Sequence, residues 1–305
     1  MKAAVIGVGH LGRHHARILS SMPGITLSGI VDTNRERAEE LAREFGSVAV
    51  DTAGAIEGLN LAVVATPTES HFEIAQGLIA SGVHVLVEKP ITQTLEQADA
   101  LIEAARGRGV VLAVGHSERF NPAVIAARPY IKDPRFIEVH RLGTQVGRSL
   151  DIDVVLDLMI HDLDMILSTV PSEVDSVEAV GVPVLTPKVD IANARVRFTN
   201  GCIANLTASR ISKEPVRKIR FFQRQSYVSI DTAAKEVEMY HLVPQAGGVP
   251  SIDGGKQAVP GHEPLKSELE DFVRAASEGA APAVSGEQGR AALALAVRIV
   301  ELMRQ

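Results

Sequence analysis

The sequence predicts two domains of different class. We expect an N-terminal doubly wound parallel α/β sheet over residues 1–119, and a mainly antiparallel, open-sheet α+β domain over residues 120–305. Three observations predict this. The chain of 305 residues is longer than one hydrophobic core usually serves. Apolar strands alternate with helical segments over the first third, and shorter runs of alternating polar and apolar residues follow.

The first domain is predicted from its alternating segments. Short apolar runs predict buried strands at residues 2–7, 26–31, 59–65, 84–88 and 110–115. Helical patterns lie between them at residues 13–20, 35–45, 70–81 and 94–108. This order is typical of a parallel sheet with right-handed crossovers. Ligands bind such sheets beyond the carboxyl ends of the strands, so we expect functional residues there.

A G-x-G-x-x-G sequence follows the first strand and consists of Gly7, Gly9 and Gly12, with His10 and Leu11 before the last glycine. The glycines allow a tight turn, a close approach of backbone to a pyrophosphate, and close packing of helix on strand. The amides at the start of the helix point at the phosphates. We therefore expect these five residues to bind a dinucleotide.

Asp32 ends the second strand, 20 residues after Gly12. A carboxylate at this point holds the ribose hydroxyls of the adenosine half and disfavours a 2′-phosphate, so NAD is expected rather than NADP. Arg35 or Arg37 can accept a phosphate if Asp32 turns away. The alternative is that Asp32 only caps a turn or the next helix.

The second domain is predicted from short strands at residues 136–145, 174–184, 191–198, 202–210, 216–223, 227–231 and 236–242. Asn200-Gly201 is a hairpin signal between two of them. Helices expected near residues 151–170, 263–277 and 286–305 can cover one side of the sheet. Residues 244–264, rich in Gly and Pro, are expected to form a mobile loop that covers the site or reaches a neighbouring subunit.

Composition excludes several classes of function. A net charge of -6 and an aromatic content of 4% without Trp argue against nucleic-acid partners. Cys202 is the only cysteine, which excludes disulfide frameworks and multi-cysteine metal sites, and we expect no metal. No uncharged apolar run approaches the roughly 18 residues that span a bilayer. A soluble, cytoplasmic protein is therefore expected.

Further motifs lie at the predicted strand ends and in one helix. They are Glu88-Lys89-Pro90, Thr66-Pro67 with His71, the segment from Gly115 to Pro122, and Asp157 with His161 and Asp164. In this order, and with the glycine loop, they resemble the glucose-fructose oxidoreductase, inositol dehydrogenase and rhizopine-catabolism (Gfo/Idh/MocA) family over essentially the whole chain. His15 lies where that family often has a histidine in its first helix.

The resemblance implies a Rossmann domain that binds NAD and a second domain that binds a sugar. It implies that Thr66, Pro67, His71 and Glu88 contact the cofactor. It also implies that His116, Arg119 and Asn121, at the domain junction, contact the substrate or the nicotinamide; a packing role is the alternative for Arg119 and Asn121.

Three residues suit the chemistry of alcohol oxidation, which needs a base for the hydroxyl proton and positive charge near the developing carbonyl. Lys89 lies at the ligand edge of the sheet, where a lysine loses solvation. Asp157 and His161 are four residues apart on one predicted helical face, and a carboxylate beside an imidazole raises its basicity. We assign His161 as base, Lys89 as the group that polarises the oxygen and Asp157 as orienter.

These assignments have alternatives. The roles of Lys89 and His161 can be exchanged. Lys89 can instead be a solvated surface lysine, and Asp157 a capping residue near an unrelated core histidine.

The substrate is suggested by likeness within the family. Residues 116–122, together with residues 160–164, look most like members that act on UDP-N-acetylglucosamine. Those members oxidise the C3 hydroxyl to a 3-keto sugar, which an aminotransferase then consumes. Six basic side chains within residues 210–224 would suit a diphosphate, or else form a solvated sheet face.

Two other functions stay open. One is an inositol or other sugar dehydrogenase of the same family, and the other is a non-catalytic NAD-binding sensor. The family resemblance also implies a homodimer or homotetramer formed through the C-terminal sheet.

Overall fold

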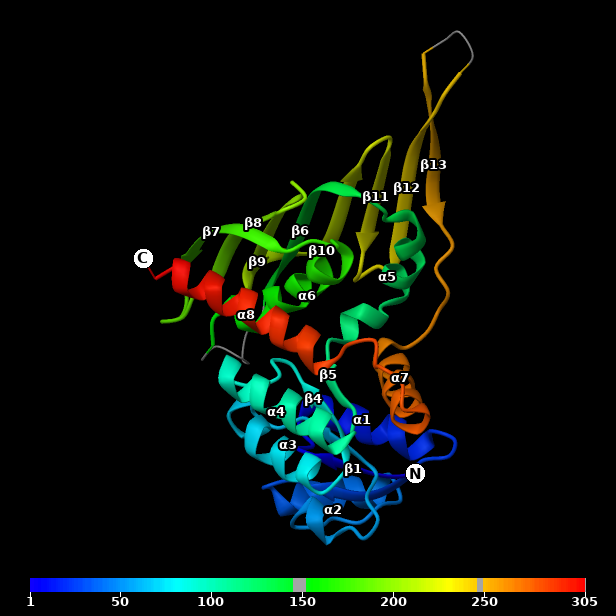
Figure 1. Ribbon diagram of the computed structural model, residues 1–305, viewed down its shortest axis with the longest axis vertical. Coiled ribbons are helices and arrows are strands. Elements are labelled where there is room, and N and C mark those ends of the chain that lie inside the picture. The colour runs from blue at the N-terminus through cyan, green and yellow to red at the C-terminus, as the bar shows by residue number, and fades with distance from the viewer. Residues whose placement is uncertain (145–151, 246–248, 305) are drawn as a thin grey trace. The chain divides into compact units, whose positions relative to one another are not determined.

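The computed structural model describes residues 1–144, 152–245 and 249–304. The chain forms two compact units (Figure 1). The first comprises Met1–Ser117 and Glu263–Arg290, and the second comprises Glu118–His262 and Ala291–Gln305. The domain boundary expected between residues 119 and 120 stays a prediction. That expectation did not include residues 263–290, which return to the first unit.

The first unit is built on a five-stranded parallel sheet in the order β2-β1-β3-β4-β5. The strands are β1 (Lys2–Ile6), β2 (Thr26–Val31), β3 (Leu61–Val64), β4 (His84–Glu88) and β5 (Leu112–Gly115). Ala49 adds a parallel bridge to Ile30 beyond β2. The chain moves outward in opposite directions from β1 and β3, so the crevice beyond their carboxyl ends is the topological switch point.

Helices of the first unit are α1 (His10–Ser21), α2 (Arg35–Glu44), α3 (His71–Ala80), α4 (Leu95–Arg108) and α7 (Pro264–Glu278). Their ends follow local chemistry. Asn34 caps α2, and Thr94 forms a capping box with Gln97 at the start of α4. Gly109 ends α4 in the left-handed region, at φ 66°. Among the described residues, no helix is long and apolar enough to cross a membrane.

The expectation that residues 263–277 cover the second sheet is wrong. Helix α7 packs on α1 in the first unit, where Leu269 and Phe272 join a core that contains Ile18 and Leu19. The sequence of α7 has the apolar stripe of an amphipathic helix, but such a stripe does not predict which of the two hydrophobic cores will bury it. Helix α8 (Gly286–Leu302) begins in the first unit and continues, from Ala291, in the second.

The second unit is built on an eight-stranded sheet in the order β13-β12-β11-β10-β6-β9-β8-β7. Its strands are β6 (Pro134–Thr144), β7 (Val174–Val182), β8 (Ile191–Phe198), β9 (Ile203–Ser209), β10 (Ile211–Gln223), β11 (Ser226–Asp231), β12 (Glu236–Val243) and β13 (Ser251–Gln257). Neighbours are antiparallel except β6 and β9, which are parallel. The predicted mainly antiparallel sheet is confirmed.

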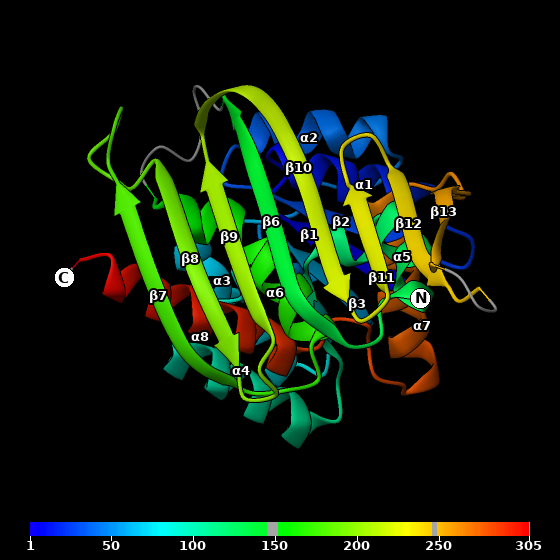
Figure 2. The same ribbon diagram turned by 90° about the horizontal axis from the view of Figure 1, so that it is seen from above.

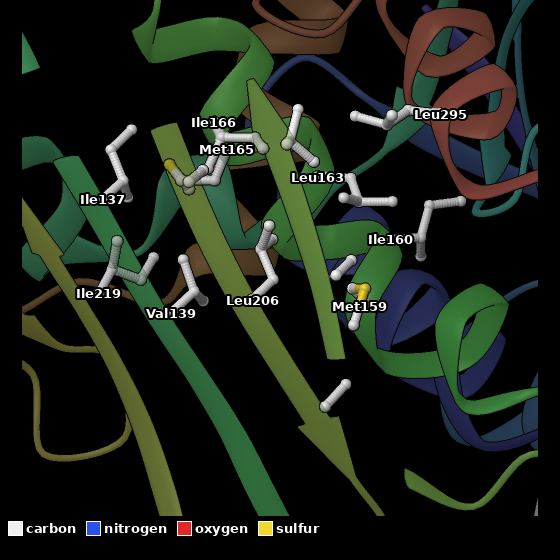
Figure 3. Close-up of a cluster of buried hydrophobic side chains, with 14 of the residues drawn as sticks. Ile137, Val139, Met159, Ile160, Leu163, Met165, Ile166, Leu206, Ile219 and Leu295 are labelled. Carbon is white, nitrogen blue, oxygen red and sulfur yellow. The ribbon is translucent and has the colours of Figure 1, made fainter. Parts of the chain in front are cut away.

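One face of this sheet is covered by helices α5 (Pro122–Ala127), α6 (Ile160–Thr169) and α8 (Figures 1 and 2). Side chains from the strands meet those of α6 and α8 in a buried hydrophobic core (Figure 3). The labelled members come from both layers: Ile137, Val139, Leu206 and Ile219 from strands, Ile160, Leu163, Met165, Ile166 and Leu295 from helices, and Met159 from the turn that precedes α6.

Two local structures differ from the prediction. Residues 155–159 form a π-helical turn ahead of α6, instead of a continuous α-helix. Part of the predicted mobile loop 244–264 forms strand β13. The sequence did not predict this strand, because Gly254-Gly255 lies within it and glycine is unfavourable in strands. Gln145 and Asp151 of the predicted elements, residues 246–248 of that loop, and Gln305 lie outside the described residues.

Candidate active site

The glycine loop after β1 brings the first turn of α1 close to the sheet. Gly7 has φ +84°, and a Cβ on it would lie 2.7 Å from the Ala65 carbonyl oxygen. A Cβ on Gly12 would lie 1.8 Å from the Gly7 carbonyl oxygen, so only glycine fits there. Gly9, in contrast, has open space around its Cα. Its neighbours His10 and Leu11 are exposed in the first turn of α1.

The N-terminus of α1 is open to a ligand. Within the described ranges, no side chain caps this helix, and no acidic residue lies in its first turn. The free amides and the positive end of the helix dipole therefore suit an anion. The close packing at Gly12 and the space at Gly9 fit a pyrophosphate lying against the backbone.

Asp32 is held in place at the end of β2. Its Oδ2 accepts from Val8 N at 2.8 Å, and its Oδ1 accepts from Asn34 N at 2.8 Å and from Arg37 Nη2 at 2.7 Å. Partial burial opposes ionisation, but these hydrogen bonds together lower the pKa of Asp32. The side chain is thus a carboxylate, and a lone pair of Oδ2 is left for a ribose hydroxyl.

A cleft of about 520 Å³ joins these groups, and its lining includes Gly7, Gly9, Asp32, Thr66 and Pro67. A neighbouring cavity of about 700 Å³ shares Ile6, Val31 and Ile74 with the cleft. The structure therefore brings together the glycine loop, Asp32 and the Thr66-Pro67 loop, as the sequence predicts, and the donor set fits a dinucleotide.

His71 connects two strand-end loops. It is 1% exposed; its Nε2 contacts the Thr66 carbonyl oxygen at 2.9 Å, and its Nδ1 contacts the Pro90 carbonyl oxygen at 3.0 Å. Burial lowers the pKa of His71, against the effect of the two carbonyls. A direct contact of His71 with a cofactor stays a prediction; its ring positions the loops after β3 and β4.

Glu88 lies buried at the end of β4, 6% exposed. Its Oε1 is 2.8 Å from Nε2 of His15, and its Oε2 accepts from the backbone N of Lys89 at 3.3 Å. Although burial opposes ionisation, His15 and then Lys89 lower the pKa of Glu88. The peptide bond between Lys89 and Pro90 is cis. One carboxylate oxygen of Glu88 thus bonds His15, and the other bonds the backbone of Lys89, which holds this part of the chain in place.

Glu268 is a residue that the sequence reasoning missed. It lies on the buried face of α7, 2% exposed, within 4.8 Å of ligand atoms of His15 and Glu88. The signal was present, because Leu265, Leu269 and Phe272 place Glu268 on the apolar stripe of that helix. An acid on such a stripe is unusual.

The remaining catalytic candidates belong to the second unit. Asp157 lies in the π-helical turn and is 8% exposed, and His161 is the second residue of α6. The predicted spacing of one α-helical turn is therefore altered, since the π-helical turn has a longer period. The joint role of the two residues stays a prediction.

Two buried arginines hold the start of α6 through Asp162 and Asp164, which both follow His161 in sequence. Arg119 donates to Asp164 through Nε at 2.6 Å and Nη2 at 2.7 Å. Arg141 donates to Asp162 at 2.8 Å through both Nε and Nη2, and to Glu118 through Nη1 at 3.2 Å. Bidentate pairs of this kind set orientation as well as energy. The helix that carries His161 is thus anchored twice.

The predicted substrate residues are placed as follows. Asn121 caps α5 through its Oδ1 and donates from Nδ2 to the Thr232 carbonyl oxygen at 3.0 Å. His116 is buried and follows β5 directly. Arg119 is buried with Asp164. Contacts of the three with a substrate stay predictions.

The basic side chains of residues 210–224 do not form one free patch in the described part of the chain. Arg210 donates to the Ile152 carbonyl oxygen at 2.7 Å and lies near Asp190. Arg220 pairs with Glu138 at 2.7 Å, and Lys218 lies 3.8 Å from Asp231. These pairings weaken the argument for a diphosphate at this segment.

Comparison with known proteins agrees with this geometry. Residues 1–116 match the family model described as "Oxidoreductase family, NAD-binding Rossmann fold", and residues 144–225 match the "GFO/IDH/MocA C-terminal domain". The chain is 40% identical over 304 residues to a UDP-N-acetylglucosamine 3-dehydrogenase of Acidithiobacillus ferrooxidans, covering 98% of this chain and 96% of the relative.

Other relatives are less similar in sequence. A scyllo-inositol 2-dehydrogenase (NAD(+)) of Bacillus subtilis is 29% identical over 70% of this chain and 68% of its own.

Solved structures share the fold of this chain. A structure of the UDP-N-acetylglucosamine 3-dehydrogenase of Acidithiobacillus ferrooxidans has a TM-score of 0.93 at 38% identity, covering 100% of this chain and 99% of that one. Levoglucosan dehydrogenase in complex with NADH shares the fold, with a TM-score of 0.88 at 21% identity and coverage of 100% and 97%.

We expect that Asp164→Asn lowers the free energy of unfolding by about 3–5 kcal/mol, because it leaves the Arg119 guanidinium buried without its counter-charge. Chemical denaturation monitored by circular dichroism measures this. The matched control is Asp99→Asn, which removes a surface pair with Arg290 and should leave the unfolding midpoint near that of the wild type. Equal effects of the two changes would contradict the anchoring role.

Proposed function

Because the chain belongs to the Gfo/Idh/MocA family of oxidoreductases, we propose that it is an NAD-dependent dehydrogenase that oxidises the C3 hydroxyl of UDP-N-acetylglucosamine to a 3-keto sugar. The observation that carries the proposal is the similarity, along essentially the whole of both chains, to a UDP-N-acetylglucosamine 3-dehydrogenase. Inositol dehydrogenases are more distant relatives.

The first unit supports the cofactor part of the proposal. The amides at the start of α1 hold the pyrophosphate, and the Asp32 carboxylate accepts from the adenosine ribose hydroxyls. Thr66 and Pro67 line the same cleft. Bound NAD supplies the nicotinamide ring that accepts the hydride from the substrate carbon. An ionised Asp32 repels a 2′-phosphate, which favours NAD over NADP.

The chain's own residues do the proton chemistry. His161 takes the proton of the substrate hydroxyl, and Asp157 orients its imidazole. The Lys89 ammonium holds the reacting oxygen and stabilises the charge that develops on it. Arg119 and Arg141 act through Asp164 and Asp162, which fix the helix of His161. His116, Arg119 and Asn121 are proposed to border the sugar.

A substrate panel tests the proposed reaction. The protein is incubated with NAD and either UDP-N-acetylglucosamine, free N-acetylglucosamine or myo-inositol, with NADH absorbance followed and the products identified by mass spectrometry. We expect NADH and a keto product only with the UDP-sugar. Turnover of myo-inositol in preference would overturn the substrate assignment. NAD binding without turnover of any compound would favour a cofactor-binding sensor.

We expect Lys89→Ala and His161→Ala each to lower kcat by about a hundredfold or more, the usual contribution of a positioned acid, base or charge. Steady-state kinetics with the substrate identified by the panel measures this. Lys256→Ala is the control, since Lys256 pairs with Glu236 on the exposed β12–β13 hairpin. Rates near that of the wild type in both site variants would remove the assignment.

We further propose a homodimer or homotetramer formed through the C-terminal sheet. The sheet face opposite α5, α6 and α8 faces the viewer in Figure 2. A row of aromatic rings crosses it from β6 to β12: Phe136, Phe222, Tyr227 and Tyr240, with successive centroids 5.4, 5.1 and 6.4 Å apart. The whole sequence has only eight Phe and three Tyr, and two of each residue type lie in this row. Phe222 is 37% exposed. Burial against a second copy would remove this apolar surface from water.

We expect Phe222→Lys to shift the protein to a smaller oligomer in size-exclusion chromatography with light scattering, because a charge would enter the apolar interface. Val48→Lys, at an exposed apolar position of the first unit, is the control and should not change the mass. A monomeric wild-type protein would contradict the proposal.

The setting of the reaction is proposed on chemical grounds. A single buried cysteine suits the reducing cytoplasm, where NAD and nucleotide sugars are available. A 3-keto sugar is a substrate for transamination, so we propose a sugar aminotransferase as the next enzyme.

A further inference from the structure

Three buried ionisable side chains meet inside the first unit, each from a different element. They are His15 of α1, Glu88 of β4 and Glu268 of α7, with 0%, 6% and 2% of their surface exposed. Each offers an atom within 4.8 Å of the other two. This cluster contains two carboxyl groups but only one ring that can donate a proton to them.

The bonds within the cluster are unequal. Oε1 of Glu88 lies 2.8 Å from His15 Nε2, and Oε2 of Glu88 accepts from Lys89 N. Both oxygens of Glu268 are buried and, within the described residues, neither has a hydrogen-bond partner. A carboxylate left in this way would lose its hydration without compensation, which costs several kcal/mol.

Glu268 therefore differs from Glu88 in protonation. Burial, then the negative charges of Glu88 and Asp271, raise the pKa of Glu268 well above its usual range. For Glu88 burial acts in the same direction, but His15 and Lys89 outweigh it and its pKa falls. Neighbouring carboxyl groups whose environments push their pKa values apart commonly serve different purposes in an active site.

We propose that Glu268 is held as a neutral carboxylic acid and acts, through Glu88 and His15, as a positioning residue for Lys89. Its proton leaves Glu88 as the only negative charge in the cluster. Glu88 can then keep both of its bonds, one to His15 and one to the backbone of Lys89. The proposal rests on the proposed function, in which Lys89 holds the reacting oxygen.

Loss of the Glu268 proton would disturb this arrangement. Two buried negative charges within 4.8 Å of each other repel strongly, and Glu88 is the one that accepts a hydrogen bond from the backbone of Lys89. The groups that face Glu268 are His15 from α1, Glu88 from β4 and Asp271 from its own helix. His14 and Arg17 of α1 interact with Glu263 instead. Activity should thus fall on the alkaline side as Glu268 ionises.

The sign of the stability effect follows from the raised pKa. In the unfolded chain Glu268 ionises near the ordinary value for glutamate, whereas in the folded chain it keeps its proton to a higher pH. Its contribution is therefore complete below the ordinary value and is lost as pH rises through the folded value. Between the two, the folding equilibrium constant falls up to about tenfold per pH unit from this group alone.

The test compares Glu268→Gln, which keeps the shape and stays neutral, with the wild type and with Glu270→Gln. Glu270 lies two residues away on the exposed side of α7, beside Lys266, and is the matched control. Three measurements are made: unfolding against pH without cofactor, the infrared band of a protonated carboxyl group, and the pH profiles of kcat and kcat/KM with the substrate identified by the panel.

We expect the protonated-carboxyl band in the wild type and in Glu270→Gln and its loss in Glu268→Gln. Only in Glu268→Gln should the fall of the folding equilibrium constant with pH become less steep. Only in this variant should the alkaline limb of the kcat profile move to higher pH. If Glu268→Gln does not fold, Glu268→Met and titration of the wild-type band decide the protonation state. A stoichiometric metal ion in the purified protein would overturn the proposal, since a cation would then replace the proton.

Failure of this proposal is distinguishable from failure of the proposed function. The infrared and unfolding measurements need no substrate, so they decide the state of Glu268 even if UDP-N-acetylglucosamine is not oxidised. A wild-type infrared spectrum without the band would overturn the neutral carboxylic acid. An unchanged alkaline limb of kcat in Glu268→Gln, with the band present in the wild type, would overturn the link to Lys89.

Discussion

Both units bury ionisable side chains, and every buried charge needs a partner close by. In the second unit Arg119 and Arg141 meet Asp164 and Asp162 in bidentate pairs that fix the first turn of α6. In the first unit His15 meets Glu88 beside Lys89. An unpaired charge in either place would cost several kcal/mol, so the pairs fix the elements that carry the proposed catalytic residues.

The cofactor cleft depends on a different constraint, the close approach of backbone to backbone. The Gly7 and Gly12 positions leave no room for a side chain, while Gly9 leaves space for a ligand. Helix α1 can then begin directly above the sheet with its amides free. Asp32, tied to Val8 of the same loop, keeps its charge at the end of the neighbouring strand. Chain geometry thus determines both the proposed anion site and the proposed ribose site.

Glu268 shows how the two constraints interact with topology. The chain leaves the first unit after residue 117 and returns at residue 263 with α7. That return places a carboxyl group against Glu88, far from it in sequence, and completes the cluster behind Lys89. The proposed substrate chemistry needs Lys89 charged and well placed, which is the reason to expect the cluster to influence the pH range of activity.

Much of this protein could be predicted from local patterns in its sequence. The period of apolar residues, the glycine spacing and the strand-end position of Asp32 depend on near neighbours. They indicated the parallel sheet correctly, and the glycine loop and Asp32 do line one cleft. The π-helical turn at Asp157, the strand β13 and the destination of α7 depend on contacts between distant residues. So does the protonation of Glu268, because desolvation and neighbouring charge arise only once the chain has folded.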